Sequence, residues 1–354
     1  MARIQTLTDS DWIEVVAPEW EALHRGSHSA TPFHSPAWLR AWSETVGRRF
    51  RPEVWLIREG NDLVGMFPLT RTQAPWVALR SMASGMSDLL HPLAAPGYEQ
   101  VVSAAIRDRV AELEGVHLLD LHQIRADHPL ADLANPDEIK PQAECPVLNL
   151  PATFEAYLAT LSKSLRTDVN RGLKKNPEIR TVSDGSDPVE LLEQFFDLHG
   201  RRWKKRGLPG AFGFKRVREF HRSFVRKAAP EDLWLSVFRH EGEPIGAIYA
   251  LRTGGQVSFY QSGFSPDHRA LCPGSVLIGW TIRRAIEEGC HTFDFLRGAE
   301  PYKLRWKPQQ VVANLRWMRH SRPGWGRFAL AVNQAEARIE ARIRQRLEGR
   351  GLVG

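Results

Sequence analysis

The stretch of sequence that decides the fold is residues 257–306, VSFYQSGFSPDHRALCPGSVLIGWTIRRAIEEGCHTFDFLRGAEPYKLRW. Its pattern predicts a strand, a loop, a helix and a second strand in succession. Pro273, Gly274 and Ser275 are typical of a helix start. Gly289 is typical of a helix end, and HTFDFL then reads as the second strand. The stretch therefore predicts a β-loop-α-β unit.

The start of this helix is suited to binding an anion. The first backbone N–H groups of a helix lack partners within it, and the helix dipole favours negative charge there. Gly274 has no Cβ and allows close approach of a phosphate, while Arg269 supplies a positive charge five positions earlier. Taken alone, Pro-Gly-Ser is equally typical of an ordinary cap. The flanking strands favour a phosphate-binding loop over residues 269–275.

Length and composition describe an ordinary folded protein. The chain has 354 residues, of which 42% are hydrophobic and 25% charged, so we expect two domains and little disorder. The sequence shows neither a signal-peptide pattern nor eighteen consecutive apolar residues. Its cysteines, Cys145, Cys272 and Cys290, lack metal-ligand spacing, so we expect no metal site and a reducing compartment. The cytoplasm is the expected location.

Positive charge gathers in two stretches beyond the overall +7. Residues 199–227 contain eleven Lys or Arg against one acid, a net charge of +10. Residues 319–350 contain eight Lys or Arg against three acids, a net charge of +5. Such a field attracts nucleotide phosphates, nucleic acid or anionic lipid. A solvated basic face is an equally good interpretation.

The two halves of the chain share a pattern. Residues 54–69, VWLIREGNDLVGMFPL, parallel residues 233–251, LWLSVFRHEGEPIGAIYAL, in strand, polar turn and strand, with Gly65 and Gly246 at matching places. We predict an α/β (mixed α+β) fold with two related modules, each a mixed sheet flanked by helices. The expected parts are residues 1–150, 151–320 and a basic helical tail, 321–354.

Two segments near the boundary also carry expectations. The proline-containing stretch 122–146 shows no long periodic run and is predicted to be a connection. Residues 154–175 carry apolar side chains at helical spacing and are predicted to form one amphipathic helical segment.

Residues 150–318 resemble the Gcn5-related N-acetyltransferase (GNAT) superfamily. They are most similar to the BioF2-like domain of CelD-type proteins, associated with cellulose and exopolysaccharide synthesis. The first half fits through FHSPAWLRAW, LVGMFPL and Ser87-Asp88, so the resemblance covers residues 30–318. The group is similar to the FemABX transferases, which have two GNAT-like domains in tandem. The matching residues in the second half are Tyr260, Ser262, Gly263, Phe264, Pro266, Pro273, Gly274, Gly289, Phe293, Asp294, Phe295, Gly298, Glu300, Tyr302, Lys303 and Trp306.

The resemblance implies acetyl-CoA or another acyl-CoA as co-substrate. GNAT proteins hold it with a loop written Arg/Gln-x-x-Gly-x-Gly/Ala, and here Cys272 replaces the first glycine. Pro273 also removes one backbone donor. The resemblance places the pantetheine arm along the strand ending in Phe264. The implied donor-binding residues are Ser262, Gly263, Phe264, Arg269, Gly274 and Ser275.

The same resemblance supplies candidates for proton transfer and acceptor binding. An amine must lose a proton as it attacks the thioester, and the departing thiolate can take one. Tyr302 is the candidate acid, and Glu300 or Asp294 the base. Asp294 bracing a turn and Tyr302 packing in the core are alternative interpretations. The residues assigned to the acceptor are Tyr260, Arg297 and Lys303, while Arg305 either binds an anion or faces solvent.

Three functions stay open from the sequence. The leading one is an acyl-CoA-dependent N-acyltransferase acting on an amine of an amino sugar or a cell-envelope or exopolysaccharide precursor. The second is a FemABX-like aminoacyltransferase that uses aminoacyl-tRNA. The basic stretch 199–227 supports it, because a tRNA donor needs an extended basic surface. The third is a GNAT-like binding module without catalysis. The sequence does not predict the oligomeric state.

Overall fold

The computed structural model describes residues 2–73, 75–128, 139–175, 177–204, 207–208 and 210–320. The predicted basic helical tail, 321–354, lies outside them. The chain divides into two compact units. Of the described residues, those within 2–39, 47–143 and 312–320 form unit 1, and those within 40–46 and 144–311 form unit 2. The assignment of functional modules to residues 1–150 and 151–320 stays a prediction.

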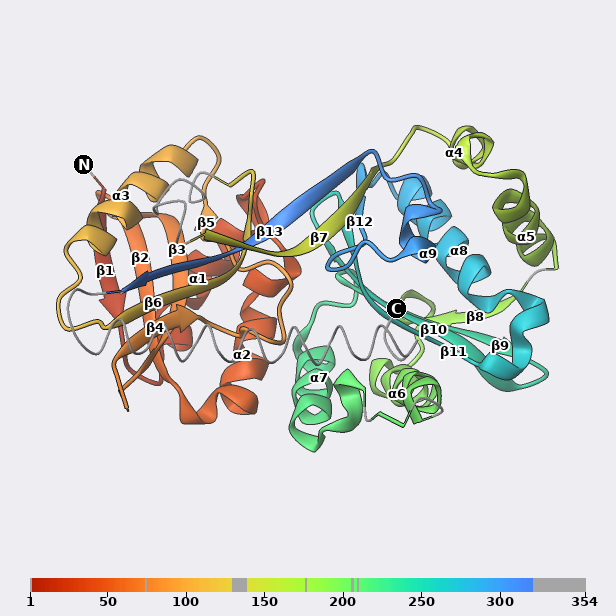
Figure 1. Cartoon of the computed structure of the whole chain (residues 1–354), viewed down its shortest axis with the longest axis horizontal. Coiled ribbons are helices and arrows are strands. Elements are labelled where there is room, and N and C mark those ends of the chain that lie inside the picture. The colour runs from red at the N-terminus through yellow and green to blue at the C-terminus, as the bar shows by residue number, and fades with distance from the viewer. Residues whose placement is uncertain are drawn as a thin grey trace. The chain divides into compact units, whose positions relative to one another are not determined.

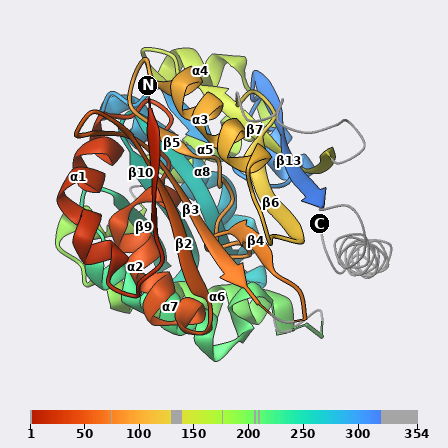
Figure 2. The same ribbon diagram turned by 90° about the vertical axis from the view of Figure 1, so that its left-hand side faces the viewer.

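Unit 1 is a mixed sheet with helices on both faces. Its strands run in the order β1-β2-β3-β4-β6-β13. Neighbours are antiparallel except for β4 and β6, which are parallel. In Figure 2, which looks onto this unit, α1 and α3 lie on either side of β2 and β3. The elements are β1 (Arg3–Leu7), α1 (Trp12–Gly26), α2 (Pro36–Glu44, shared with unit 2), β2 (Arg51–Glu59), β3 (Asp62–Thr72), β4 (Ala78–Ser81), β5 (Leu93–Ala94), α3 (Glu99–Ala111), β6 (Leu118–Arg125) and β13 (Gln310–His320).

Unit 2 has the same plan. Its strands run in the order β8-β9-β10-β11-β12-β7, with only β11 and β12 parallel. Figure 1 shows α4, α5 and α8 on one face of this sheet and α6 and α7 on the other. The elements are β7 (Ile139–Asn149), α4 (Phe154–Thr160), α5 (Lys163–Lys174), β8 (Glu178–Thr181), α6 (Pro188–Lys204), α7 (Lys215–Lys227), β9 (Leu233–His240), β10 (Glu243–Thr253), β11 (Gln256–Phe264), α8 (Pro273–Glu287), β12 (Thr292–Asp294) and α9 (Pro301–Leu304).

The two units repeat one topology, and each receives its last strand from a distant part of the chain. β7 follows β6 along the chain but pairs with β12 in unit 2. β13 follows β12 along the chain but pairs with β6 in unit 1. The strands are thus exchanged between the repeats. The predicted α/β fold with two related modules is confirmed.

A matching glycine lets the central helix approach the sheet in each unit. A Cβ added to Gly65 on β3 would lie 2.4 Å from Val102 Cγ2 of α3. A Cβ added to Gly246 on β10 would lie 3.0 Å from Leu277 Cδ1 of α8. These are the two glycines that align in the sequence repeat, so the pattern has a packing cause.

Two local expectations were wrong. The stretch 122–146 is not a connection throughout, because β6 extends to Arg125 and β7 begins at Ile139. The segment 154–175 forms two helices instead of one. Ser162 separates them, because its extended backbone and its hydroxyl, which accepts from Leu165 N at 3.4 Å, make it the N-cap of α5.

Candidate active site

The strands β11 and β12 pair over only three residues and then separate. Gln256–Ser258 pair with Thr292–Asp294. β11 continues to Phe264, whereas the chain after β12 turns toward β7, where Phe295 N donates to Pro146 O at 2.9 Å. Within the described residues, the later part of β11 therefore has no strand partner on that side. A substrate with an extended polar arm can use those free backbone groups.

A β-bulge lies where the two strands separate. On β10, Tyr249 pairs with Gln261 and Ala250 with Phe259, so Tyr260 is an extra residue on β11. A bulge turns a side chain out of the regular alternation. The Tyr260 ring lies 5.4 Å from that of Tyr249 and 5.6 Å from that of His221. The predicted acceptor residue Tyr260 therefore stands on the α6 and α7 side of the sheet.

A cavity of about 490 Å³ lies at the start of α8. Four of the six predicted donor-binding residues line it, namely Phe264, Arg269, Gly274 and Ser275. Its remaining lining residues are Asp168, Ser265, Pro266, Cys272, Pro273 and Arg305. The first helical hydrogen bond runs from Val276 N to Cys272 O, so the N–H groups of Gly274 and Ser275 precede it. Both groups suit an anion.

The other two predicted donor residues are not in this wall. Ser262 is buried in β11. Gly263 faces α6, where an added Cβ would lie 2.6 Å from the backbone nitrogen of His199. The glycine therefore has a packing reason that is independent of any ligand. Contact of either residue with a donor stays a prediction.

Cys272 shapes the loop through its backbone. It adopts the left-handed conformation, with φ 48° and ψ 47°, as the N-cap of α8. Glycine is the residue that takes this conformation without steric cost. The sequence departs from the GNAT loop at this position, yet the backbone takes a conformation that glycine favours. The Cys272 side chain points toward α5, since Arg171 Nη2 lies 3.8 Å from its Sγ.

Two residues of the cavity wall come from α5 and α9, outside the loop, and of these only Arg305 is considered from the sequence as a residue that could bind an anion. Asp168 lines the cavity from α5 and lies 3.3 Å from Arg171 Nη2. Arg305 reaches it from the end of α9. Two glycines are the sequence signal for the approach of α5 to α8. Gly172 of α5 packs on Val276, and Gly279 of α8 packs on Val169. That close crossing brings α5 beside α8.

The loop after β12 holds the candidate catalytic residues in a fixed arrangement. Asp294 is buried, and its Oδ1 accepts from Leu296 N at 2.7 Å, which supports the left-handed backbone of Leu296 (φ 53°). Glu300 covers Gly298, where a Cβ would lie 2.5 Å from Glu300 Oε1. Tyr302 is half-buried and packs on the core of unit 2. Their catalytic roles stay predictions.

Lys303 is tied within this loop. It is 5% exposed, and its Nζ donates to Arg297 O at 2.6 Å and lies 3.1 Å from Glu300 Oε2. These contacts link Lys303 to Arg297 and Glu300 and so hold residues 297–303 in one conformation. Arg305, by contrast, stands in the cavity wall. Arg305 is therefore better placed than Lys303 to meet an anionic group in the cavity.

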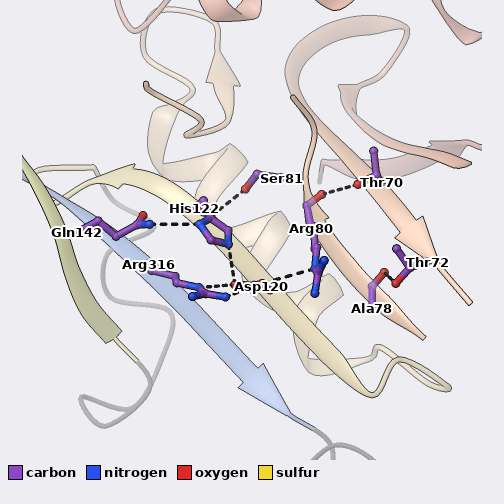
Figure 3. A network of polar contacts seen from close by, with 9 residues as sticks. All are labelled: Thr70, Thr72, Ala78, Arg80, Ser81, Asp120, His122, Gln142 and Arg316. Atoms are coloured by element: carbon purple, nitrogen blue, oxygen red, sulfur yellow. Dashed lines mark hydrogen bonds and ion pairs between the residues drawn. The ribbon is translucent and has the colours of Figure 1, made fainter. Parts of the chain in front are cut away.

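The position equivalent to Asp294 in unit 1 is occupied by a charge network (Figure 3). Asp120 pairs with Arg80 across the parallel strands, as Asp294 does with Ser258. Arg316 binds the Asp120 carboxylate through two nitrogens at 2.8 and 3.0 Å, and His122 Nε2 lies at 3.1 Å. Burial opposes ionisation, but His122 and Arg316 hold the pKa of Asp120 well below its usual range.

Comparisons with known proteins agree with this geometry. Residues 163–304 match the family model of the acetyltransferase (GNAT) domain. The fold is similar to that of FemX, with a TM-score of 0.61 at 9% identity over 90% of this chain and 95% of FemX. It is also similar to L-PGS from Bacillus licheniformis, with a TM-score of 0.52 at 12% identity over 92% and 96% of the two chains.

A further similar structure is the C-terminal domain of a putative lysylphosphatidylglycerol synthetase from Agrobacterium fabrum. Its TM-score is 0.50 at 13% identity, over 84% of this chain and 95% of that domain. A comparison with curated proteins finds no match. The match to the acetyltransferase (GNAT) domain is thus confined to residues 163–304. The domain lies within unit 2, which also holds the cavity at the start of α8.

The described residues lack two features that would indicate other kinds of site. They contain no group of three or more His, Cys, Asp or Glu side chains arranged to hold a metal ion. None of their helices is both long and apolar enough to span a bilayer.

Proposed function

We propose that unit 2 binds an acyl-CoA in the cavity at the start of α8 and transfers its acyl group to an amine. The observation that supports this proposal is the cavity wall itself. Arg269 and Arg305 face it beside the N–H groups of Gly274 and Ser275. Two cations and a helix start suit a pyrophosphate. Pro273 and Cys272 leave these two amide groups in place.

The proposed transfer needs one proton to leave the amine and one to reach the sulfur. The amine nitrogen attacks the thioester carbonyl, the carbon–sulfur bond breaks, and the thiolate leaves with a proton. We assign the acid to Tyr302 and the base to Glu300 or Asp294. Glu300 is the better placed of the two carboxylates, since it is partly exposed whereas Asp294 is buried. The proposed acceptor is an amino sugar or a cell-envelope or exopolysaccharide precursor.

Binding of the donor is the first test. Acetyl-CoA at 100 times its dissociation constant should add about 2.7 kcal/mol to the free energy of unfolding. Arg269→Gln and Arg305→Gln should each weaken donor binding about tenfold. Arg180→Gln, an exposed arginine on β8 that pairs with Glu178, is the matched control. The proposal would be rejected if no acyl-CoA of a panel binds the protein, or if the Arg269→Gln and Arg305→Gln variants bind acyl-CoA as tightly as the wild-type protein.

Calorimetric titration of the full chain with acetyl-CoA would give the number of donor sites. Unit 1 has no Lys or Arg between Asp88 and the first turn of α3, and Glu99 stands in that turn. Negative charge at a helix start repels a phosphate. We therefore propose one donor site per chain.

An aminoacyl-tRNA donor is the second candidate, supported by α7. This helix carries six Lys or Arg and one acid over Lys215–Lys227. Arg222 pairs with Glu193 and Lys227 with Glu44, which neutralises part of that charge. Salt-sensitive tRNA binding that Arg216→Gln and Arg226→Gln weaken would favour this donor. If the protein does not bind tRNA at low salt, this candidate is rejected. If it binds neither acyl-CoA nor tRNA, the third function, a GNAT-like binding module without catalysis, remains.

A further inference from the structure

A second cavity, of about 470 Å³, lies in unit 2 on the other side of α5. Its lining residues come from α4, α5 and α8, which Figure 1 shows together on one face of the sheet. They are Phe154, Glu155, Leu158, Ala159, Arg166, Asn170, Leu173, Lys174 and Arg283. Its size falls within the usual range of small-molecule sites, about 300–1,000 Å³.

The helix α5 separates this second cavity from the cavity at the start of α8. One side of α5 turns Val169 and Gly172 toward α8. Asp168 lines the cavity at the start of α8, whereas Arg166 and Lys174 line the second cavity. The two cavities therefore share no lining residue, and a variant in one leaves the wall of the other intact.

The second cavity combines an apolar floor with positive charge. Phe154, Leu158 and Leu173 belong to, or pack on, the core of unit 2 and present apolar surface. A bound aliphatic chain would gain about 0.8 kcal/mol for each CH₂ that it buries on such a surface. Phe154 and Leu158 are only 6% and 8% exposed, so an apolar ligand group would cover the edges of these side chains together with the partly buried Leu173.

The charges of the cavity do not balance. Three cations, Arg166, Lys174 and Arg283, line it against one acid, Glu155. Arg283 pairs with Glu287 at 2.7 Å. Among the described residues, the Arg166 guanidinium donates to one backbone carbonyl, that of Ala159, at 3.4 Å. Among the described acids, none forms an ion pair with Lys174. With Arg283 paired, Arg166 and Lys174 against Glu155 leave one net positive charge, which an anionic group would satisfy.

We propose that the second cavity binds a phosphate monoester carried on an aliphatic chain. The phosphate would lie between Arg166 and Lys174, and the chain would lie on Phe154, Leu158 and Leu173. This assignment follows from the two properties of the wall, because neither a free phosphate nor a neutral chain satisfies both. It does not depend on the acyl-CoA donor.

The test is calorimetric titration of the full chain with dodecyl phosphate below its critical micelle concentration. We expect binding of dodecyl phosphate at least about tenfold tighter than that of inorganic phosphate or of monomeric dodecyl maltoside. Equal affinity for inorganic phosphate, or no binding of dodecyl phosphate, would overturn the proposal.

Matched variants locate the site. Lys174→Gln and Arg166→Gln should each weaken dodecyl phosphate binding about tenfold. Lys163→Gln is the control, because Lys163 lies on the same helix but lines neither cavity. If Lys163→Gln weakens binding as much as Lys174→Gln, the ligand follows general surface charge and the proposal fails. Displacement by acetyl-CoA, or weakening by Arg269→Gln, would place the ligand in the other cavity and would likewise overturn it.

Discussion

Replacing Cys272 by glycine should stabilise unit 2. Cys272 holds φ 48° and ψ 47°, a conformation that costs an L-residue about 1–2 kcal/mol. Glycine removes that cost but gains about 0.5–1 kcal/mol of unfavourable entropy on folding. The difference leaves a gain of about 0.5–1 kcal/mol. For a unit of this size such a gain raises the melting temperature by about 2 °C.

The matched control is Cys272→Ala. Alanine keeps the Cβ and therefore the backbone cost, but it loses the contact between Cys272 Sγ and Arg171 at 3.8 Å. Urea unfolding of both variants separates the two effects, with Cys272→Gly more stable than the wild-type protein and Cys272→Ala no more stable than it. If Cys272→Gly proves no more stable than Cys272→Ala, the backbone argument is refuted, and the sulfur decides the stability of this loop.

Two other predictions concern packing and pH. Gly263→Ala should destabilise unit 2 by about 1–3 kcal/mol, because its Cβ would lie 2.6 Å from His199 N, a backbone atom that cannot rotate away. Urea unfolding measures this loss. The control is Gly200→Ala, because a Cβ at Gly200 would meet nothing within 4 Å. In unit 1, burial lowers the pKa of His91 to about 4, so stability is full above the unfolded pKa of about 6.5 and falls by up to about 3 kcal/mol as the pH drops toward 4. Unfolding of His91→Asn at pH 7 and pH 4.5 should show a shallower loss than that of the wild-type protein, and an equal loss in both would contradict the assignment.

Local rules predicted the elements around the loop because short-range chemistry controls them. Pro273 begins α8 where the sequence places a helix start. Gly289 has φ 73° just after the helix, a conformation that glycine adopts freely. The repeat was visible because Gly65 and Gly246 meet the same steric demand under a helix.

Long-range pairing was not predictable from the same signals. The exchange of β7 and β13 depends on which distant strands become neighbours, and neither strand carries that information in its own residues. Prolines 141 and 146 also concealed β7, since proline normally weakens a strand assignment. In the site, the sequence left open whether Arg305 binds an anionic acceptor or donor group or faces solvent, because its place depends on the turn after β12.

The two repeats show how one position serves two purposes. Asp120 and Asp294 both end the paired part of a parallel strand, in unit 1 and unit 2 respectively. Across from Asp120 stands Arg80, and with Arg316 it surrounds the carboxylate with charge. Across from Asp294 stands Ser258, and the Asp294 carboxylate accepts the backbone N–H of Leu296.

This difference has a consequence for ligand binding. The Asp120 carboxylate, held by Arg80 and Arg316 and in contact with His122, closes its strand junction into a network that a ligand would have to break. Breaking a buried pair costs about 3–5 kcal/mol. The junction at Asp294 supports a turn and leaves β11 without a strand partner beyond Ser258 within the described chain. The unpaired end of β11 therefore supports our proposal of a donor site in unit 2, on grounds that are independent of its α8 loop.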